Sequence, residues 1–375
     1  MSRFLQLLLA AALCAVLPAR ADDGMKDGVD RNAPDFVRAS VLFVTPGTQF
    51  FSRVGHTFLR LECPTYGLDY CFSYESESVE NRLLSFLAGN LKMGLFAVPA
   101  EKFLAQYGPE GRGVVQYALN LPPPVKQKLW KLLDEKAAAS RDLPYDYIRR
   151  GCAKAVLDVL REALAPARIV SSHAQSSYRE SFYRELRHLH PWSLLLISSV
   201  GGTEGDELTD VATPRDLLDY LRHAAVDGVP LLGEGPREVL PVSARETATV
   251  VTPFLVSWLV VALAVLNLFV KKPYLDWSFL GVQCAVGLFI LYLMTASRLP
   301  TSCWNWLVVP FCPLMPAVWR WRAKWAWPFL AVLLAWDLSM FASGRPRVDP
   351  ALLVAVLGYV VFYLKFVLPQ RKGKS

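Results

Sequence analysis

The sequence predicts an exported α+β domain followed by an all-α membrane bundle of five helices. Three observations predict this order. Residues 1–21 have a basic start, a short apolar run and small residues at Ala19 and Ala21, which is the pattern of a secretory signal peptide. Residues 22–246 combine strand-like alternation with helix-like periodicity. Residues 247–375 contain five apolar segments, each close to the roughly 20 residues that span a bilayer.

Alternation of apolar and polar residues predicts the strands of the exported domain. In chain order they cover residues 39–44, 55–61, 70–74 and 114–121. In the second strand His56, Phe58 and Arg60 share one face, and the third strand is its expected hairpin partner. By itself, His56 has two interpretations, a structural histidine or a base.

Helical periodicity predicts helices over residues 125–139, 152–164, 177–189 and 215–225. The second of these follows Gly151, and its apolar residues are Ala153, Val156, Leu157 and Leu160. Cys152 therefore lies in the first turn, where the helix dipole and free N–H groups favour a thiolate. Arg149, Arg150 and Lys154 add positive charge nearby. The alternative is that Cys152 is only a small apolar residue under a helix.

The composition excludes some classes of function. The net charge is +7, but residues 247–375 carry 12 Lys and Arg against 3 Asp and Glu, which leaves 28 against 30 for residues 1–246. The basic excess therefore belongs to the membrane half, and we do not expect nucleic acid binding. The short interval between Cys63 and Cys71 is compatible with a local disulfide. The histidines are scattered, so we expect no metal ion and no cofactor.

The five apolar segments cover residues 249–270, 277–296, 303–319, 325–342 and 351–368. Basic residues fall in alternate loops, at Lys271, Lys272, Arg320, Arg322, Lys324, Arg371, Lys372 and Lys374. This charge pattern places the C-terminus in the cytoplasm and the first domain outside. The third segment contains Pro310, Pro313 and Pro316, which predict a kinked or partly re-entrant helix.

A histidine on an early strand and a cysteine at a helix start about a hundred residues later are the two parts that a cysteine hydrolase or acyltransferase requires. The thiolate forms a thioester, and the imidazole holds and moves the proton. The N–H groups at the start of the helix could stabilise the oxyanion. Neither His56 nor Cys152 is specific alone.

Two motifs resemble a known family. They are Val54-Gly55-His56-Thr57-Phe58-Leu59-Arg60, and Tyr145-Asp146-Tyr147 ahead of Gly151-Cys152-Ala153 and Asp158. Together with the layout they resemble the Lnb-type lipoprotein N-acyltransferases, whose periplasmic domain is a permuted papain-like (NlpC/P60-type) cysteine domain. The resemblance implies that Cys152 is the nucleophile and His56 the base. It also implies a phospholipid acyl donor, a lipoprotein acceptor and a multi-pass protein of the bacterial inner membrane, with the N-terminal domain in the periplasm.

The sequence departs from the family pattern at several positions. Gly151 stands where the family often has Asn, and Lys154 stands where it has a Thr-like residue. Ser73-Tyr74-Glu75 replaces an Asn-Tyr-Gly segment, which leaves Ser73 and Glu75 both open as the residue that orients His56. Arg60 shares the face of His56 and could bind a lipid phosphate or form a structural salt bridge.

Two other functions fit the same residues. A membrane-anchored cysteine hydrolase, acting on phospholipid or cell-wall peptide, would resolve the acyl enzyme with water. A non-enzymatic membrane scaffold would use the exported domain to bind a partner. The scaffold predicts that Cys152 and His56 are far apart, whereas either enzyme requires them within reach of a hydrogen bond or one water.

Overall fold

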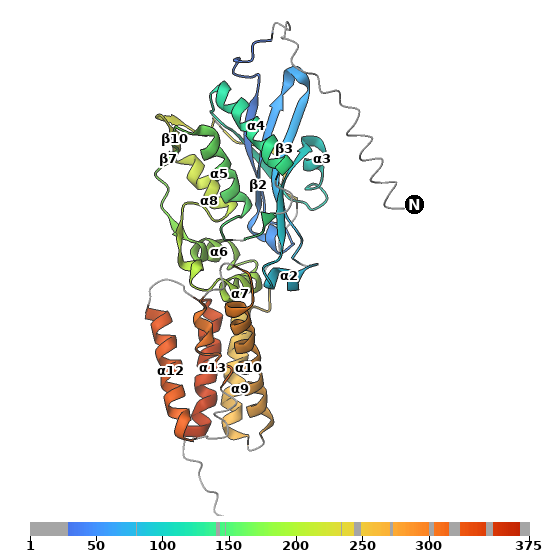
Figure 1. Ribbon diagram of the computed structural model, residues 1–375. Helices are drawn as coiled ribbons and strands as arrows, with labels where there is room; N and C mark the ends of the chain where they lie inside the picture. The colour runs from blue at the N-terminus through green and yellow to red at the C-terminus, as the bar shows by residue number, and fades with distance from the viewer. Residues whose placement is uncertain are drawn as a thin grey trace, which may run out of the picture.

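The protein has an α/β part built on an antiparallel sheet and, below it, a bundle of apolar helices (Figure 1). This arrangement confirms the mixed α and β fold expected from the sequence. The computed structural model describes residues 29–79, 81–139, 143–146, 148–233, 235–243, 249–270, 273–299, 304–314, 323–342 and 348–367. The predicted signal peptide, residues 1–21, lies outside these ranges.

Seven antiparallel strands form the main sheet, in the order β12-β5-β1-β2-β3-β4-β6. Their bounds are β1 Arg38–Val44, β2 His56–Cys63, β3 Leu68–Ser76, β4 Lys92–Pro99, β5 Val114–Ala118, β6 Leu143–Pro144 and β12 Arg237–Leu240. All four predicted strands are present, and β3 is the hairpin partner of β2. Short strands complete two small sheets, namely β7 Val170–Ser171, β8 Ser176–Ser177, β9 Leu208–Thr209, β10 Ala224–Val226 and β11 Val229–Pro230.

Helices cover both faces of the main sheet. One face packs Leu59, Leu61 and Phe72 against α4 (Pro123–Ala139), α5 (Cys152–Leu164) and α8 (Pro214–Arg222). The other packs Leu42, Phe58 and Cys71 against α3 (Ala100–Ala105). Alternate residues of each strand thus enter opposite cores, as the pleat requires. The predicted helices 125–139 and 152–164 are confirmed almost to the residue.

The local disulfide between Cys63 and Cys71 does not form, since both thiols are free and buried. The strand register gives the reason. Cys63 pairs with Leu68, whereas Cys71 pairs with Arg60, three residues away along β2. That offset separates the two positions by about 10 Å along the strand and turns the side chains to opposite faces. A disulfide cannot bridge such a gap.

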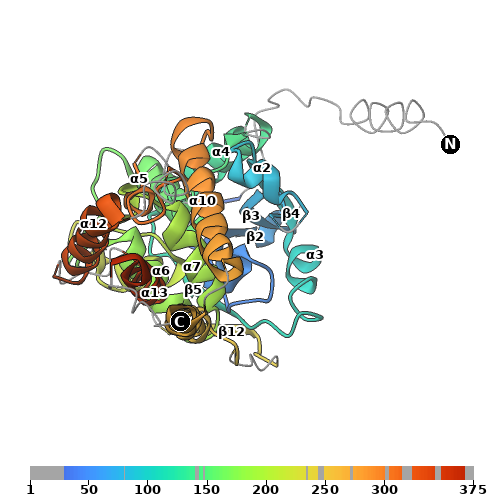
Figure 2. The same ribbon diagram turned by 90° about the horizontal axis from the view of Figure 1, so that it is seen from below.

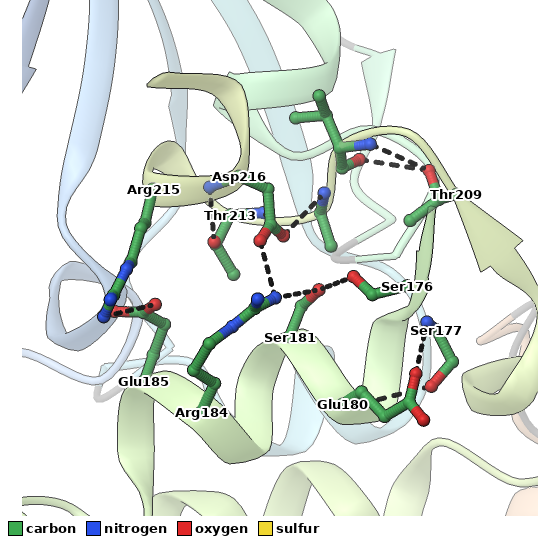
Figure 3. Close-up of polar contacts among 12 residues, drawn as sticks. Ser176, Ser177, Glu180, Ser181, Arg184, Glu185, Thr209, Thr213, Arg215 and Asp216 are labelled. Atoms are coloured by element: carbon green, nitrogen blue, oxygen red, sulfur yellow. Dashed lines mark hydrogen bonds and ion pairs between the residues drawn. The ribbon is translucent and has the colours of Figure 1, made fainter. Parts of the chain in front are cut away.

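Two helices lie between the sheet and the bundle, α6 (Tyr178–Leu186) and α7 (Pro191–Val200) (Figure 1). Figure 3 shows the polar contacts that fix α6 to α8. Arg184 donates to the buried carboxylate of Asp216 at 2.9 Å, and that carboxylate also accepts from the backbone N–H of Thr213 at 3.1 Å. Arg184 therefore holds the start of α8 in place.

Four helices form the described part of the bundle, α9 Pro253–Phe269, α10 Tyr274–Thr295, α12 Ala323–Ala342 and α13 Pro350–Val367. By length and composition, α10 and α13 can cross a membrane, whereas α9 and α12 have shorter apolar stretches. Within the third predicted segment the structure describes residues 304–314, which form the 3-10 helix η5 (Trp306–Val308) and turns. Most of the basic loop residues, among them Lys271 and Arg320, lie outside the described residues.

Hydrogen bonds join the α/β part to the bundle. The loop after α10 donates from Arg298 N to Ala88 O at 2.9 Å and from Ser297 Oγ to Leu87 O at 2.6 Å. Leu87 ends the short helix α2 (Leu83–Leu87), which follows β3. Seen from below, α10 lies beneath α2 and the sheet, with α12 on the far side (Figure 2). The α/β part is therefore attached along α2 as well as through the chain that enters α9.

Candidate active site

A cavity of about 260 Å³ opens at the end of the sheet that faces the bundle. His56, from the start of β2, and Cys152, from the start of α5, both line it. Glu75, near the end of β3, lines it too. The structure thus brings together the two residues that the sequence motifs selected, although 96 positions separate them in the chain. The scaffold interpretation expected them to be far apart.

Gly55 determines where the ring of His56 lies. It has φ +84°, and a Cβ there would lie 2.8 Å from the backbone oxygen of Val44. Only glycine combines that backbone conformation with such a close approach. The chain therefore turns sharply out of the 3-10 helix η1 (Phe51–Val54) and directly into β2, so that His56 is its first residue.

A short hydrogen-bond chain orients His56. Its Nε2 lies 2.7 Å from Ser73 Oγ, and the Ser73 hydroxyl donates to Glu75 Oε1 at 2.7 Å. Glu75 Oε1 is itself 3.2 Å from His56 Nε2. Ser73 is fully buried, so its hydroxyl has a fixed place in this chain. The sequence left Ser73 and Glu75 as alternatives, and the structure places both beside Nε2, which leaves Nδ1 as the ring nitrogen available to Cys152.

The electrostatics of the site favour a charged imidazole. Burial is the largest influence and lowers the pKa of His56, but the charges of Glu75 and Cys152 and side-chain hydrogen bonds to both raise it to about 10. The pKa of Glu75 shifts in the opposite direction. Burial raises it, but the charge of His56, hydrogen bonds from His56 and Ser73, and the charge of Arg112 lower it below its usual value. At neutral pH the pair is therefore an imidazolium and a carboxylate.

Cys152 is the first residue of α5, as the periodicity predicted, and Gly151 is the N-cap. The loop before it is shaped by Asp146, which is buried and whose Oδ1 accepts from the N–H groups of Ile148 and Arg149, each at 3.0 Å. Because the first N–H groups of a helix have no intrahelical acceptor, those near the sulfur are free for an oxyanion.

The basic residues that neighbour Cys152 in the sequence form ion pairs or hydrogen bonds with groups other than Cys152. Arg149 pairs with Glu204 at 3.2 Å, and Lys154 lies 3.7 Å from Asp158. Arg150 donates to Pro144 O of β6 at 3.3 Å. His56, by contrast, interacts with Cys152 through its charge and a side-chain hydrogen bond, whereas the sequence had suggested these three side chains.

Arg60 is held in a network on the sheet. Its Nε and Nη2 donate to the two carboxylate oxygens of Asp69, at 2.8 and 2.7 Å, and Nη1 donates to Gln116 at 3.0 Å. Arg60 is not among the residues that line the cavity around Cys152. Of its two interpretations, this geometry favours the structural salt bridge over a lipid phosphate.

Arg112 and Tyr107 also line the cavity, and no motif in the sequence indicated either of them. Arg112 lies in the turn before β5 and is only 6% exposed, and its guanidinium carbon sits 5.1 Å from the centre of the Tyr107 ring. Burial raises the pKa of Tyr107, so its hydroxyl stays protonated. The only sequence signal for Arg112 is its position between Gly111 and Gly113, next to a buried strand.

Part of the remaining cavity wall is apolar and packs toward the bundle. It is formed by Phe50, Phe51, Val54, Val79, Phe182 and Ile197. These side chains belong to, or pack against, one hydrophobic cluster that also contains Leu293 of α10 and Val356 of α13. The cavity thus combines polar residues, among them His56, Glu77 and Gln106, with an apolar patch that packs toward the bundle. Among the described residues, no group of three or more His, Cys, Asp and Glu could hold a metal ion.

Comparison with known families gives one match. Residues 29–186 match the family model of the Lnb N-terminal periplasmic domain. This stretch is less than half of the chain, and it contains both His56 and Cys152. The match supports the resemblance of this part of the chain to Lnb-type proteins. Comparisons with curated proteins and with solved structures found no match.

Proposed function

We propose that this protein is a membrane-bound lipoprotein N-acyltransferase that works through a Cys152 thioester. The observation that carries the proposal is the interaction between His56 and Cys152 in a cavity that is lined in part by apolar side chains of the cluster shared with the bundle. The resemblance of residues 29–186 to the Lnb N-terminal periplasmic domain supplies the class of substrates. Acyl transfer from a lipid requires a nucleophile and space for an apolar chain in the same place.

In the first step, the Cys152 thiolate attacks an ester carbonyl of a phospholipid. The N–H groups at the start of α5 stabilise the oxyanion that forms. As the tetrahedral intermediate collapses, the bond between the carbonyl carbon and the glycerol oxygen breaks, and that oxygen takes the proton from the His56 imidazolium. The products are a lysophospholipid and an acyl thioester on Cys152.

In the second step, the α-amine of a diacylglyceryl-cysteine at a lipoprotein N-terminus attacks the thioester. His56, now neutral, takes a proton from the amine nitrogen, and the carbon–sulfur bond breaks to restore the Cys152 thiolate. The product is a lipoprotein with a third acyl chain in amide linkage. The first product leaves before the acceptor reacts, so ping-pong kinetics are expected.

The chain order and the fold fit a permuted papain-like domain. In this chain the histidine strand comes before the cysteine helix, and α5 packs on an antiparallel sheet. We further propose that the bundle is the transmembrane domain of a bacterial inner-membrane protein, with residues 22–246 in the periplasm and the C-terminus in the cytoplasm. The apolar α10 and α13 support this location. Both substrates, a phospholipid and a lipoprotein anchor, are membrane lipids that would reach the cavity from the bundle side.

Intact mass spectrometry of the N-terminal peptide of a model lipoprotein tests the proposal. The lipoprotein is co-expressed with the wild-type chain, or with Cys152→Ala, in cells that lack their own N-acyltransferase. We expect a mass gain of one acyl chain with the wild type and none with Cys152→Ala. Cys63→Ala is the matched control, because Cys63 is buried and lies outside the cavity.

Membrane insertion of each variant is checked by fractionation. Acylation that persists with Cys152→Ala contradicts the proposed nucleophile. Release of free fatty acid by the wild type, without any acylated lipoprotein, would instead favour the hydrolase.

A further inference from the structure

Arg112 is the second buried cation of the cavity, and the proposed chemistry does not use it. Its side chain is held at several points. Nε donates to Thr45 O at 2.8 Å, and Nη1 lies 3.3 Å from Glu110 Oε2. Gly47 leaves room for the stem, since a Cβ there would lie 3.0 Å from both Cδ and Nε of Arg112. The guanidinium is therefore fixed rather than free to follow solvent.

One end of this guanidinium has no partner. Nη2 is buried and makes no hydrogen bond with any described residue, although Arg112 lines the cavity. A buried charged donor without an acceptor is costly, so such a group is expected to meet an acceptor when the cavity is filled. Arg179 provides a contrast, because it is equally buried but has all three nitrogens bonded, to Asp206, Ser198 O and Gly202 O.

The proposed substrates differ in which of them offers an anion. The acceptor brings an α-amine, ester carbonyls and a peptide, none of which is anionic at the reacting end. The phospholipid donor carries a phosphodiester on the same glycerol as the ester that Cys152 attacks. Glu75 is close enough for the charge of Arg112 to lower its pKa, but it does not occupy Nη2, which makes no hydrogen bond with any described residue. A phosphate oxygen is thus the acceptor that matches the free Nη2.

We propose that Arg112 binds the phosphodiester of the glycerophospholipid donor and so selects phospholipids over esters without phosphate. This inference rests on the proposed function. Arg112 and Cys152 line the same cavity, so one lipid can place its phosphate at the first and its ester at the second. Arg112 is a binding residue here, and the bond-breaking steps remain with Cys152 and His56.

The test compares two acyl donors on the purified full-length chain in detergent micelles. One donor is phosphatidylglycerol, and the other is p-nitrophenyl decanoate, an ester without phosphate. The rate of acyl addition to Cys152 is followed by intact mass spectrometry, and the readout is the ratio of the two second-order rate constants. We expect Arg112→Gln to lower this ratio by about 10- to 100-fold, since one hydrogen bond to a charged group is lost. Arg112→Lys, which keeps the charge, should lower it less.

Arg53→Gln is the matched control. Arg53 follows Ser52 in η1, near the cavity, but its Nε and Nη1 are bonded to Thr48 O and Ser193 Oγ, and it does not line the cavity. The ratio of the two rate constants in Arg53→Gln should equal that of the wild type. A purely structural role for Arg112 would slow both donors by the same factor and leave the ratio unchanged, which would overturn the inference. If Arg112→Gln fails to fold, Arg112→Lys takes its place. A ratio of the two rate constants that is lower than in the wild type supports the inference, and an unchanged ratio contradicts it.

Failure of the inference can be told from failure of the proposed function. A wild type that is acylated by phosphatidylglycerol, with an unchanged ratio in both Arg112 variants, contradicts only the role of Arg112. A wild type that accepts p-nitrophenyl decanoate but no phospholipid keeps the nucleophile and contradicts the donor class and the inference with it. A wild type that accepts neither donor contradicts the proposed function itself.

Discussion

Replacing Glu75 with glutamine should lower the pKa of His56 and shorten the pH range over which the imidazolium faces Cys152. Glu75 Oε1 lies 3.2 Å from His56 Nε2, and its charge is the largest of the influences that raise the pKa of His56 to about 10. Glutamine has nearly the same shape and no charge, so the substitution removes the electrostatic attraction and leaves the packing almost intact.

The distance sets the size of the effect. Two unit charges 3.2 Å apart attract by about 5 kcal/mol at an effective dielectric constant of 20 and by about 1.3 kcal/mol in bulk water. The Glu75 side chain is 43% exposed, so water screens the pair and the value falls between these limits. About 2–3 kcal/mol corresponds to a fall of about 2 pH units in the pKa of His56.

The pH dependence of Cys152 alkylation measures this change. His56 is protonated below its pKa of about 10, so the thiolate of Cys152 keeps a cationic partner up to that pH. In the wild type the rate of Cys152 alkylation by iodoacetamide should therefore form a plateau, constant up to about pH 10, and change above it, where the imidazolium loses its proton. In Glu75→Gln the plateau should end near pH 8. Mass spectrometry of the peptide that contains Cys152 separates its alkylation from that of other thiols.

Glu77→Gln is the control for this prediction. Glu77 also lines the cavity, but its carboxylate pairs with Arg82 at 2.8 Å. Its plateau should end where that of the wild type ends. If Glu75→Gln also keeps its plateau to pH 10, the charge of Glu75 does not hold the proton on His56, and the derivation of the imidazolium is wrong.

Two further predictions concern the fold. Gly89→Ala should lower the thermal midpoint in detergent more than Gly67→Ala does. Both glycines have positive φ, but a Cβ at Gly89 would lie 2.4 Å from the backbone of Arg298, whereas one at Gly67 meets nothing within 4 Å; equal shifts would contradict the contact. For the cysteines, maleimide labelling after denaturation without reductant should modify both Cys63 and Cys71, and protection of both would contradict the strand register.

Local patterns in the sequence were sufficient for much of the fold. The start of α5 at Cys152 followed from Gly151 and the apolar spacing behind it, because a helix start is decided by a few neighbouring residues. The hairpin of β2 and β3 followed from alternation for the same reason. The same alternating segment was sufficient to predict that His56 lies on β2.

The contacts that complete the site depend on pairing across strands, which the sequence does not specify. Ser73 and Glu75 were both candidates for the residue that orients His56, because the segment that contains them differs from the family pattern. The choice between them depends on where β3 places them relative to His56, and in the structure both lie beside its Nε2. Arg112 reaches the cavity from a turn before β5, and no local pattern indicates that one of its nitrogens is buried without a partner. Its role could be inferred only after the cavity was known.

The helical bundle shows the same limit. Composition located the apolar segments, and α9, α10, α12 and α13 agree with four of them. In the third segment the prolines indicated a break, and residues 304–314 form η5 and turns that pack against α10. Gln283 of α10 donates to Pro310 O at 2.7 Å, a contact that depends on the tertiary fold.

The hydrophobic cluster that Phe86, Phe182 and Ile197 share with α10 and α13 has a consequence for how the protein can be handled. Cutting the chain after residue 246 would remove the helices that cover Phe86, Phe182 and Ile197, which are at most 9% exposed in the full protein. A fragment that ends at residue 246 would then expose this apolar surface to solvent and lose the packing that supports one wall of the cavity. The helices of the bundle therefore complete the hydrophobic core beneath the cavity, and the proposed chemistry should be studied in the full 375-residue chain.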